Sequence, residues 1–457
     1  MDNQVVGQRK RRYDGMMHVT GETRYVDDIS VPGTLKVKVF RSPVPKGKVL
    51  GIDTSAACAL EGVAGIITHK DVPRNVVGSD VPDQQVLAES VRYKGQPVVA
   101  VAAEDEDIAR KAVELIRVDI REESAVFDPL EAMKPDAPKV TPEGNLHIFD
   151  GHPCRRIVLG DIETGFREAD LIVEGEYFYP CQEHAPLETH VSLSVPDARG
   201  KVKIYSVAQG MMRNLRMVAR VLQAEGDDSS FDSQWAGRTH ERWESGHAAR
   251  NINLVGGVVG GAFGGRNDPQ VDSITALLAL KTGRPVKWRW TREEEMLYST
   301  YRGPWTMKYR DGVKKDGRIV ARKVVSIRDA GAYTHQGTYV VDKHCFLCSG
   351  PYYIPNVYVE GYLVYTNKAP SDAMRGFGIT PSSFATEVQM TKIADALGMD
   401  PWKIRFINAY RNGDKTASRV TLDSVHMIEC MQAVAKRAGV ELSPELMAMS
   451  SKDARRG

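Results

Sequence analysis

Hydrophobic and polar positions alternate in short runs over the N-terminal part of the chain, with one helical pattern among them. The runs LKVKVF at 35–40, GVAGIITH at 62–69 and PVVAVAA at 97–103 predict strands, and VDI at 118–120 adds a short fourth one. EDIARKAVELI at 106–116 spaces its apolar residues three and four positions apart, which predicts a helix. Together these elements predict a compact α/β unit.

The chain is too long for a single average domain, and its composition shifts once in a way that is typical of a linker. Prolines and charges gather at 129–142, in PLEAMKPDAPKVTP. With 457 residues, at least two domains are expected. We therefore place one domain at 1–140 and a second at 141–457.

The second part mixes strand and helix patterns, which predicts an α+β fold. LIVEGEYFY at 171–179 predicts a strand, and VSLSVPDARGKVKIYS at 191–206 predicts a hairpin that reverses at Asp-Ala-Arg-Gly. Gly283 and Gly398 are placed to end two helices as C-caps. The helical patterns are MRNLRMVARVLQ, VDSITALLALKTG and TEVQMTKIADALG.

Composition argues against several kinds of partner. The 61 basic and 59 acidic residues leave a formal net charge of +2, which gives no electrostatic reason to expect nucleic acid. No apolar run approaches the roughly 20 residues of a membrane helix, and the start shows no signal-peptide pattern. Six scattered cysteines do not suggest a disulfide-stapled secreted protein. We expect a cytoplasmic protein without a membrane partner, and interpret Cys345-x-x-Cys348 as buried structural thiols.

Two segments carry histidines close to acidic residues. At 226–251, His240 and His247 match no ligand spacing, so a solvated surface loop is expected. In QEHAPLETH, His184 and His190 could bind a metal together with the neighbouring glutamates. Buried residues that hydrogen-bond and support a pocket are the favoured interpretation.

The strongest local signal for chemistry is VGGAFGGR at 259–266, between an apolar run and a predicted helix. Gly260, Gly261, Gly264 and Gly265 permit positive φ and the close approach of a ligand to backbone N–H groups. The pattern is neither GxGxxG nor GxxxxGK[ST], so a tight turn or a packing contact is equally expected.

A further candidate is DAMRGFG at 372–378, in which Arg375 lies beside a permissive Gly-Phe-Gly turn. The guanidinium of Arg375 suits a phosphate or another anionic group. A buried arginine in a salt bridge is the alternative.

These three segments, in this order, resemble the xanthine dehydrogenase and aldehyde oxidase family, whose large subunits carry QEHxxLE, VGGGFGGK and FRGFG. HVTGETRYVDDI and VFRSPVP also resemble the N-terminal α/β hammerhead domain of that family. The resemblance covers nearly the whole chain. It implies an α+β protein in which a hammerhead domain precedes the first molybdopterin-binding domain.

The resemblance also implies a site. Molybdopterin, expected in its cytosine dinucleotide form, would carry molybdenum that no protein side chain ligates. Gln209 in SVAQG would donate a hydrogen bond to the oxo group, and Met374, Arg375 and Gly376 would contact the pterin. The loop that would lie against the metal's oxo face and bind the cofactor consists of Gly260, Gly261, Ala262, Phe263, Gly264 and Gly265.

Departures from the family pattern bear on the substrate. Relatives of the purine type place a glutamate after the glycine loop and an arginine upstream of IPN, where this chain has Asn267 and Lys343. Purine hydroxylation is therefore less favoured. Lys343 is a candidate to pair with a substrate carboxylate or carbonyl, and a plain surface lysine is the alternative. Ala262 stands for the third glycine of the loop and still permits close approach.

The resemblance implies partners as well. Catalytic subunits of the family continue into a second molybdopterin-binding domain with a glutamate base, whereas this chain stops at Gly457. We expect that half on a medium molybdopterin subunit, as in split relatives of the nicotinate dehydrogenase type, with a 2Fe-2S subunit and an FAD subunit as electron acceptors. The expected reaction is oxidation of an N-heterocycle or an aldehyde with oxygen from water. A non-catalytic scaffold or cofactor-maturation protein is the alternative.

Overall fold

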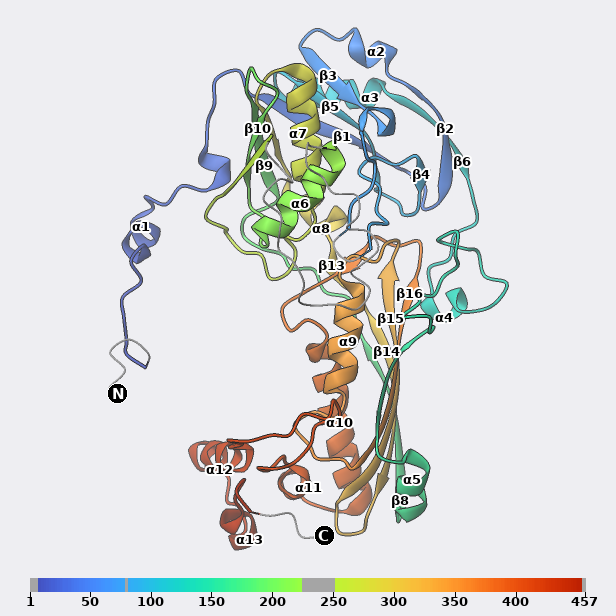
Figure 1. Cartoon of the computed structure of the whole chain (residues 1–457), viewed down its shortest axis with the longest axis vertical. Coiled ribbons are helices and arrows are strands. Elements are labelled where there is room, and N and C mark those ends of the chain that lie inside the picture. Colours follow the sequence, from blue (N-terminus) through green and yellow to red (C-terminus); the bar gives the residue numbers. More distant parts are fainter. Residues whose placement is uncertain (1–6, 79–80, 224–250, 454–457) are drawn as a thin grey trace.

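The computed structural model describes residues 7–78, 81–223 and 251–453. Figure 1 shows an elongated molecule in which two lobes follow one another along the long axis, each built on its own sheet. The predicted surface loop at 226–251, with His240 and His247, lies outside the described residues apart from Asn251.

The upper lobe contains a seven-stranded sheet to which both predicted domains contribute. β1 runs parallel to β12, with Leu35 opposite Val286, so the N-terminal unit is hydrogen-bonded to a strand far along the chain. The expected hairpin is confirmed, since β9 and β10 pair antiparallel. The boundary near residue 140 stays a prediction. In spatial order the strands are β11 (Ile252–Gly256), β10 (Val202–Ser206), β9 (Val191–Pro196), β12 (Val286–Arg289), β1 (Leu35–Arg41), β5 (Pro97–Ala103) and β3 (Val63–Ile67).

Helices complete the upper lobe. α7 (Gln270–Thr282) packs on β9, β12 and β3, and every residue from Gln270 to Ala279 is buried. α7 ends as predicted at Gly283, whose φ of 66° is the left-handed conformation of a C-cap. Two predicted helices are confirmed, α3 (Glu106–Leu115) and α6 (Met211–Leu222). α3 covers β1 and β5, and α6 packs on β11 and α7. A smaller sheet flanks this lobe and contains β4 (Ser90–Val91), β2 (Gly47–Asp53) and β6 (Arg117–Glu122).

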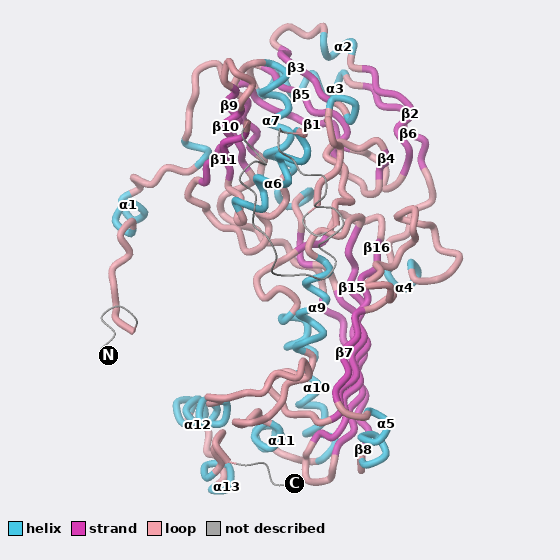
Figure 2. Tube along the Cα trace, viewed as in Figure 1, coloured by secondary structure: helices cyan, strands magenta, loops and turns pink. Residues whose placement is uncertain are grey.

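The lower lobe is a long five-stranded sheet covered on one face by two helices (Figure 2). Its strands are antiparallel except for the parallel pair β15 and β16. The covering helices are α9 (Gly337–Leu347) and α10 (Ile379–Leu397), and α10 ends at Gly398 as predicted. In spatial order the strands are β7 (Arg155–Leu159), β16 (Asn356–Tyr365), β15 (Ile319–Gly331), β14 (Trp305–Val313) and β8 (Leu171–Tyr179).

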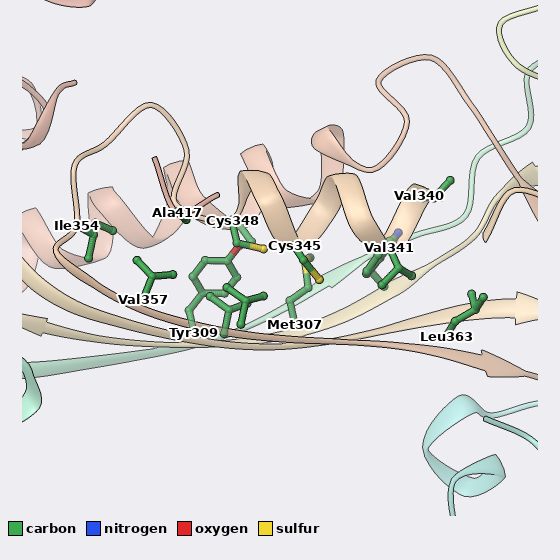
Figure 3. Packing of buried hydrophobic residues seen from close by; sticks show 14 of the residues in the cluster. Met307, Tyr309, Val340, Val341, Cys345, Cys348, Ile354, Val357, Leu363 and Ala417 are labelled. Carbon is green, nitrogen blue, oxygen red and sulfur yellow. The ribbon is translucent and has the colours of Figure 1, made fainter. Parts of the chain in front are cut away.

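The core of the lower lobe lies between this sheet and α9. Figure 3 shows Cys345 and Cys348 pointing from the helix toward Met307 and Tyr309 on the sheet. Both cysteines are free thiols with no exposed surface, and burial raises the pKa of Cys348 to about 12. The interpretation of this CxxC as buried thiols is confirmed by the complete burial of both side chains in the core.

The remaining elements are short or lie at the ends of the molecule. β13 (Tyr301–Arg302) and β17 (Ser371–Asp372) form a parallel pair. No helix in the described ranges is long and apolar enough to cross a bilayer. The other helices and helical turns are α1 (Gly15–Thr20), η1 (Val26–Asp28), α2 (Ser55–Cys58), η2 (His69–Asp71), α4 (Pro129–Ala132), α5 (Ile162–Glu168), α8 (Arg292–Tyr298), α11 (Pro401–Asn408), α12 (Met427–Ala438) and α13 (Pro444–Ala448).

Candidate cofactor site

The three segments singled out in the sequence meet in the structure. The backbone N–H of Arg375 donates to the carbonyl oxygen of Phe263 at 2.7 Å, which joins the 372–378 loop to the glycine loop. His184 contributes the third segment, since its Nε2 atom lies 2.8 Å from the carbonyl oxygen of Ala373. Segments almost 200 residues apart in sequence therefore share one site.

The middle of the glycine loop has the backbone conformation that the sequence predicted. Gly261 and Gly264 have φ values of 114° and 108°, and Phe263 between them has 53°. A Cβ on Gly264 would lie 2.3 Å from the carbonyl oxygen of Ala373, so only glycine lets the two loops touch. The Phe263 side chain is 43% exposed and stands at the surface of the site.

The two outer glycines serve a different purpose from the one expected. Neither Gly260 nor Gly265 has a positive φ, so the prediction of conformational freedom is wrong for them. A Cβ at 260 would lie 2.6 Å from the Cβ of Glu188, and one at 265 would lie 3.0 Å from the His184 ring. Glycine is needed there for space. Ala262 is accommodated, and its carbonyl accepts the Gly265 N–H at 2.8 Å.

Gln209 reaches the glycine loop from the end of β10. Its backbone N–H donates to the carbonyl of Arg266 at 2.9 Å, and its Oε1 atom accepts from the N–H of Gly264 at 3.0 Å. A backbone N–H can only donate, so this contact identifies the oxygen of the amide. The Nε2 group of this exposed side chain donates to none of the described residues and remains available as a donor.

The 372–378 loop is shaped by three consecutive positive φ values, 101° at Gly376, 42° at Phe377 and 93° at Gly378. Met374 is half-buried, and its carbonyl accepts the N–H of Phe377 at 2.7 Å. Arg375 is exposed, and its guanidinium makes no hydrogen bond or ion pair with the described residues. The alternative of a buried salt-bridge arginine is therefore wrong.

Lys343 and Asn267 occupy two positions beside these loops. Lys343 is exposed on α9, and its Nζ lies 5.6 Å from the centre of the Phe377 ring, so the lysine borders the site. The amide nitrogen of Asn267 donates to the carbonyl of Gly264 at 2.8 Å. Asn267 therefore supports the loop from within.

The histidines of QEHAPLETH are buried and hydrogen-bonded, as the favoured interpretation predicted. His184 is 8% exposed, and its ring nitrogens contact the carbonyls of Thr300 and Ala373. His190 is 5% exposed and contacts the carbonyl of Gly265 at 3.1 Å.

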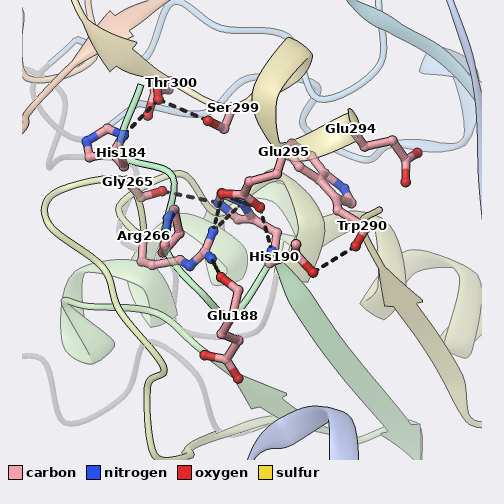
Figure 4. Close-up of polar contacts among 12 residues, drawn as sticks. His184, Glu188, His190, Gly265, Arg266, Trp290, Glu294, Glu295, Ser299 and Thr300 are labelled. Atoms are coloured by element: carbon pink, nitrogen blue, oxygen red, sulfur yellow. Dashed lines mark hydrogen bonds and ion pairs between the residues drawn. The ribbon is translucent and has the colours of Figure 1, made fainter. Parts of the chain in front are cut away.

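Sequence reasoning missed a buried ionic network behind the glycine loop (Figure 4). NH1 of Arg266 donates to Glu295 Oε1 at 2.9 Å, and NH2 of Arg266 donates to the carbonyl of Glu188. Opposing the effect of burial, His190 and then Arg266 lower the pKa of Glu295 to about 2. Glu295 comes from α8, where its neighbours are also glutamates, so no sequence pattern singles it out.

Arg302 is a second residue without a sequence signal. From the short strand β13 it donates to the carbonyl of Arg375 and to Oε1 of Gln182, the latter at 3.1 Å. Arg302 thus ties the QEHAPLETH segment to the 372–378 loop. Only the fold reveals this, because the three segments are far apart in sequence.

These groups fit molybdopterin. The exposed Arg375 guanidinium and the Gln209 amide are donors without protein partners among the described residues, and the glycines let a ligand approach the backbone closely. Such a donor set suits a large, polar, anionic cofactor.

Comparisons with known proteins agree with this geometry. The family described as "Molybdopterin cofactor-binding domain" matches residues 146–231 and 244–409. "Aldehyde oxidase and xanthine dehydrogenase, a/b hammerhead domain" matches residues 20–124.

Two curated relatives differ in how much of their length the chain covers. The large molybdopterin subunit of nicotinate dehydrogenase from Eubacterium barkeri is 31% identical over 440 residues, which are 96% of this chain and 97% of the relative. A probable xanthine dehydrogenase subunit of Bacillus subtilis is 35% identical over 407 residues, 88% of this chain and 51% of the relative. The chain thus spans about half of the latter.

Among solved structures, the aldehyde oxidoreductase from Desulfovibrio gigas superimposes with a TM-score of 0.82 at 29% identity, over 95% of this chain and 47% of that one. The order of hammerhead and molybdopterin-binding domains expected from the sequence is thereby confirmed. The chain belongs to the xanthine dehydrogenase and aldehyde oxidase family of molybdopterin-binding proteins.

Proposed function

We propose that this chain is the molybdopterin-binding large subunit of a multi-subunit molybdenum hydroxylase. The observation that carries the proposal is the junction of the glycine loop with Gln209 and with the 372–378 loop through two hydrogen bonds, of 3.0 and 2.7 Å. The proposed reaction oxidises an N-heterocycle or an aldehyde, with water as the source of oxygen.

In such a site the cofactor and the residues of this chain have different roles. Molybdopterin, proposed in its cytosine dinucleotide form, supplies molybdenum that accepts two electrons from the substrate. The residues of this chain bind and orient. Gln209 offers its Nε2 donor toward the cofactor, and Arg375 pairs with its anionic part. Gly261 and Gly264 permit the backbone to come close.

The position of Lys343 supports the proposal that the substrate is an anion. Its ammonium group lies near the ring of Phe377, and the exposed ring of Phe263 stands on the neighbouring loop. A cation beside one aromatic ring, with a second exposed ring on the neighbouring loop, suits a planar ring that carries a carboxylate, because an aromatic ring can stack on it while the cation pairs with the charge. Within the proposed reaction this favours a carboxylated N-heterocycle over a neutral aldehyde.

We propose a medium molybdopterin subunit for the rest of the site, and 2Fe-2S and FAD subunits as electron acceptors, in the cytoplasm. Several large apolar side chains on α9 and α10 are exposed in the described part of the chain, which suits burial against further polypeptide. They are Tyr339, Phe346, Leu347, Ile379, Phe384 and Val388.

The first test is purification of the native protein from cells supplied with molybdate, followed by analysis of molybdenum, iron, flavin and co-eluting chains. Stoichiometric molybdenum together with a smaller subunit supports the proposal. A single chain that is reproducibly free of molybdenum would overturn it in favour of the scaffold alternative.

The second test addresses the substrate with a matched pair of variants, Lys343→Met and Lys392→Met, the latter an exposed lysine on α10. We expect Lys343→Met to raise KM for nicotinate by about tenfold or more, as loss of a charged partner predicts. KM for benzaldehyde is expected to change little, and Lys392→Met to affect neither. Equal effects of the two variants would remove Lys343 from the substrate site.

A further inference from the structure

We propose that His190 is a positioning residue that holds the glycine loop in place, a role that rests on the proposed function. Its Nε2 atom lies 3.1 Å from the carbonyl oxygen of Gly265, the last glycine of the loop. A carbonyl oxygen can only accept, so Nε2 has to carry a proton. The position of the loop therefore depends on which ring nitrogen is protonated.

The other ring nitrogen lies between two charged side chains. The Nδ1 atom of His190 faces NH1 of Arg266, which can only donate, and lies 2.9 Å from Oε2 of Glu295, which can only accept. Burial, and after it the charge of Arg266, lower the pKa of His190. The contact with Gly265 requires its proton on Nε2.

Glu295 holds this arrangement from the other side (Figure 4). Its Oε1 atom accepts from Arg266 at 2.9 Å, and its Oε2 atom accepts from the backbone N–H of His190 at 2.7 Å. Oε2 also lies 2.9 Å from Nδ1 of His190. The side chains of Arg266 and Glu295 are each 1% exposed, so water does not compete for these contacts.

The network reaches both ends of the loop. At the first end, Oε2 of Glu188 accepts from the N–H of Gly260 at 2.7 Å, and NH2 of Arg266 donates to the carbonyl of Glu188. At the other end, His190 holds Gly265. A loop fixed at both ends keeps its middle, including the exposed Phe263, in one place.

The network also affects Gln209, the residue that faces the cofactor. Gly264 directly precedes Gly265, whose carbonyl contacts His190. The N–H of Gly264 is the donor that orients the amide of Gln209. Displacement of Gly265 would therefore turn or release Gln209. Misplacement by about 1 Å at such a site typically costs about 10²-fold in rate.

The chemistry of the two histidine nitrogens provides a matched pair of variants. In His190→Gln the side-chain amide reaches the position of Nε2 and can donate to Gly265. In His190→Asn the shorter amide reaches only the position of Nδ1. Both variants remove the ring and introduce the same neutral group, so they differ mainly in the contact with the loop.

The first measurement is amide hydrogen exchange of the peptide that contains Gly260–Gly265, in the full chain isolated from molybdate-depleted cells. We expect His190→Asn to speed exchange in this peptide by about tenfold or more, and His190→Gln to stay close to the wild type. In protein from molybdate-replete cells, we expect about tenfold less molybdenum in His190→Asn than in His190→Gln.

The proposal would be overturned if the two variants exchanged and loaded alike, whether like the wild type or both impaired by a lower unfolding temperature. If His190→Asn does not fold, Arg266→Lys provides a second variant, which keeps the buried charge but cannot donate to both Glu188 and Glu295. Unchanged hydrogen exchange in Arg266→Lys would contradict the proposal that this network holds the glycine loop. A wild-type chain that takes up no molybdenum would refute the proposed function, while the exchange experiment would still decide the role of His190.

Discussion

The Oε1 atom of Gln209 and the backbone N–H of Gly264 are joined by a 3.0 Å hydrogen bond, which directs the amide nitrogen away from the loop and leaves it as a donor. Gln209→Glu keeps an acceptor for Gly264 but replaces that donor by a carboxylate oxygen. We expect kcat of the loaded enzyme to fall by about 10²- to 10³-fold, as for other lost transition-state donors. Steady-state kinetics on enzyme of known molybdenum content provides the measurement.

The control for this variant is its molybdenum content, which reports cofactor binding. Because the Gly264 contact survives in Gln209→Glu, its molybdenum content should equal that of the wild type. A kcat within about threefold of the wild type at full molybdenum content would show that the Gln209 donor does no chemistry.

Gly264 is the point at which the two loops touch, and a methyl group there would separate them. In Gly264→Ala the new Cβ would lie 2.3 Å from the carbonyl oxygen of Ala373, and the φ of 108° is unfavourable for alanine. We expect the variant to lose most of its molybdenum and to unfold at lower urea concentration.

Gly283→Ala is the matched control, since Gly283 also has a positive φ but no atom lies within 4 Å of its Cβ position. That variant should lose only about 1–2 kcal/mol from backbone strain and retain the cofactor. Equal molybdenum contents in the two variants would mean that contact between the loops does not form the site.

Local patterns in the sequence were sufficient for several individual elements. The alternation in 191–206 predicts the hairpin β9–β10, and Gly283 and Gly398 end their helices as C-caps, because these features depend on neighbours in sequence. The strained middle of the glycine loop was also predictable, since few residue types other than glycine adopt such φ values.

Long-range relationships were not predictable. The sheet that joins β1 to β12 crosses the expected boundary near residue 140, and no periodicity in either strand specifies its partner. Arg266 and Glu295 resemble many other charged residues in this chain, and only burial makes them a network. Gly260 and Gly265 show the same limit, because the side chains that need their space come from elsewhere in the fold.

Asp311 and Arg322 form a fully buried ion pair in the lower lobe, with contacts of 2.7 and 3.0 Å between the carboxylate and the guanidinium. Arg322→Ala would leave a buried carboxylate without its partner. We expect the free energy of unfolding to fall by about 3–5 kcal/mol in urea titrations.

The neighbouring surface pair of Arg310 and Glu174, 3.4 Å apart and more than half exposed on the glutamate, provides the comparison. Arg310→Ala should cost no more than about 1 kcal/mol, because water screens the pair. If the two alanine variants were equally stable, burial of the Asp311–Arg322 pair would not matter to the fold.

Asp272 should make stability depend on pH in a direction opposite to that of most carboxylates. Burial raises its pKa to about 6, although hydrogen bonds such as the 2.7 Å contact from Ser206 partly oppose this. The folded chain therefore binds this proton more tightly than the unfolded chain, whose pKa is near 3.8. The contribution is stabilising at low pH and is lost as pH rises from about 4 to about 6, by up to about 3 kcal/mol.

Asp272→Asn removes the titration and keeps the shape of the side chain. The free energy of unfolding, measured by urea titration at several pH values for both proteins, isolates the effect of this one group. We expect the wild type to lose stability relative to Asp272→Asn between pH 4 and pH 7. A constant difference between the two proteins over this range would show that Asp272 titrates at its ordinary pKa, and that Ser206 and its neighbours compensate for burial in full.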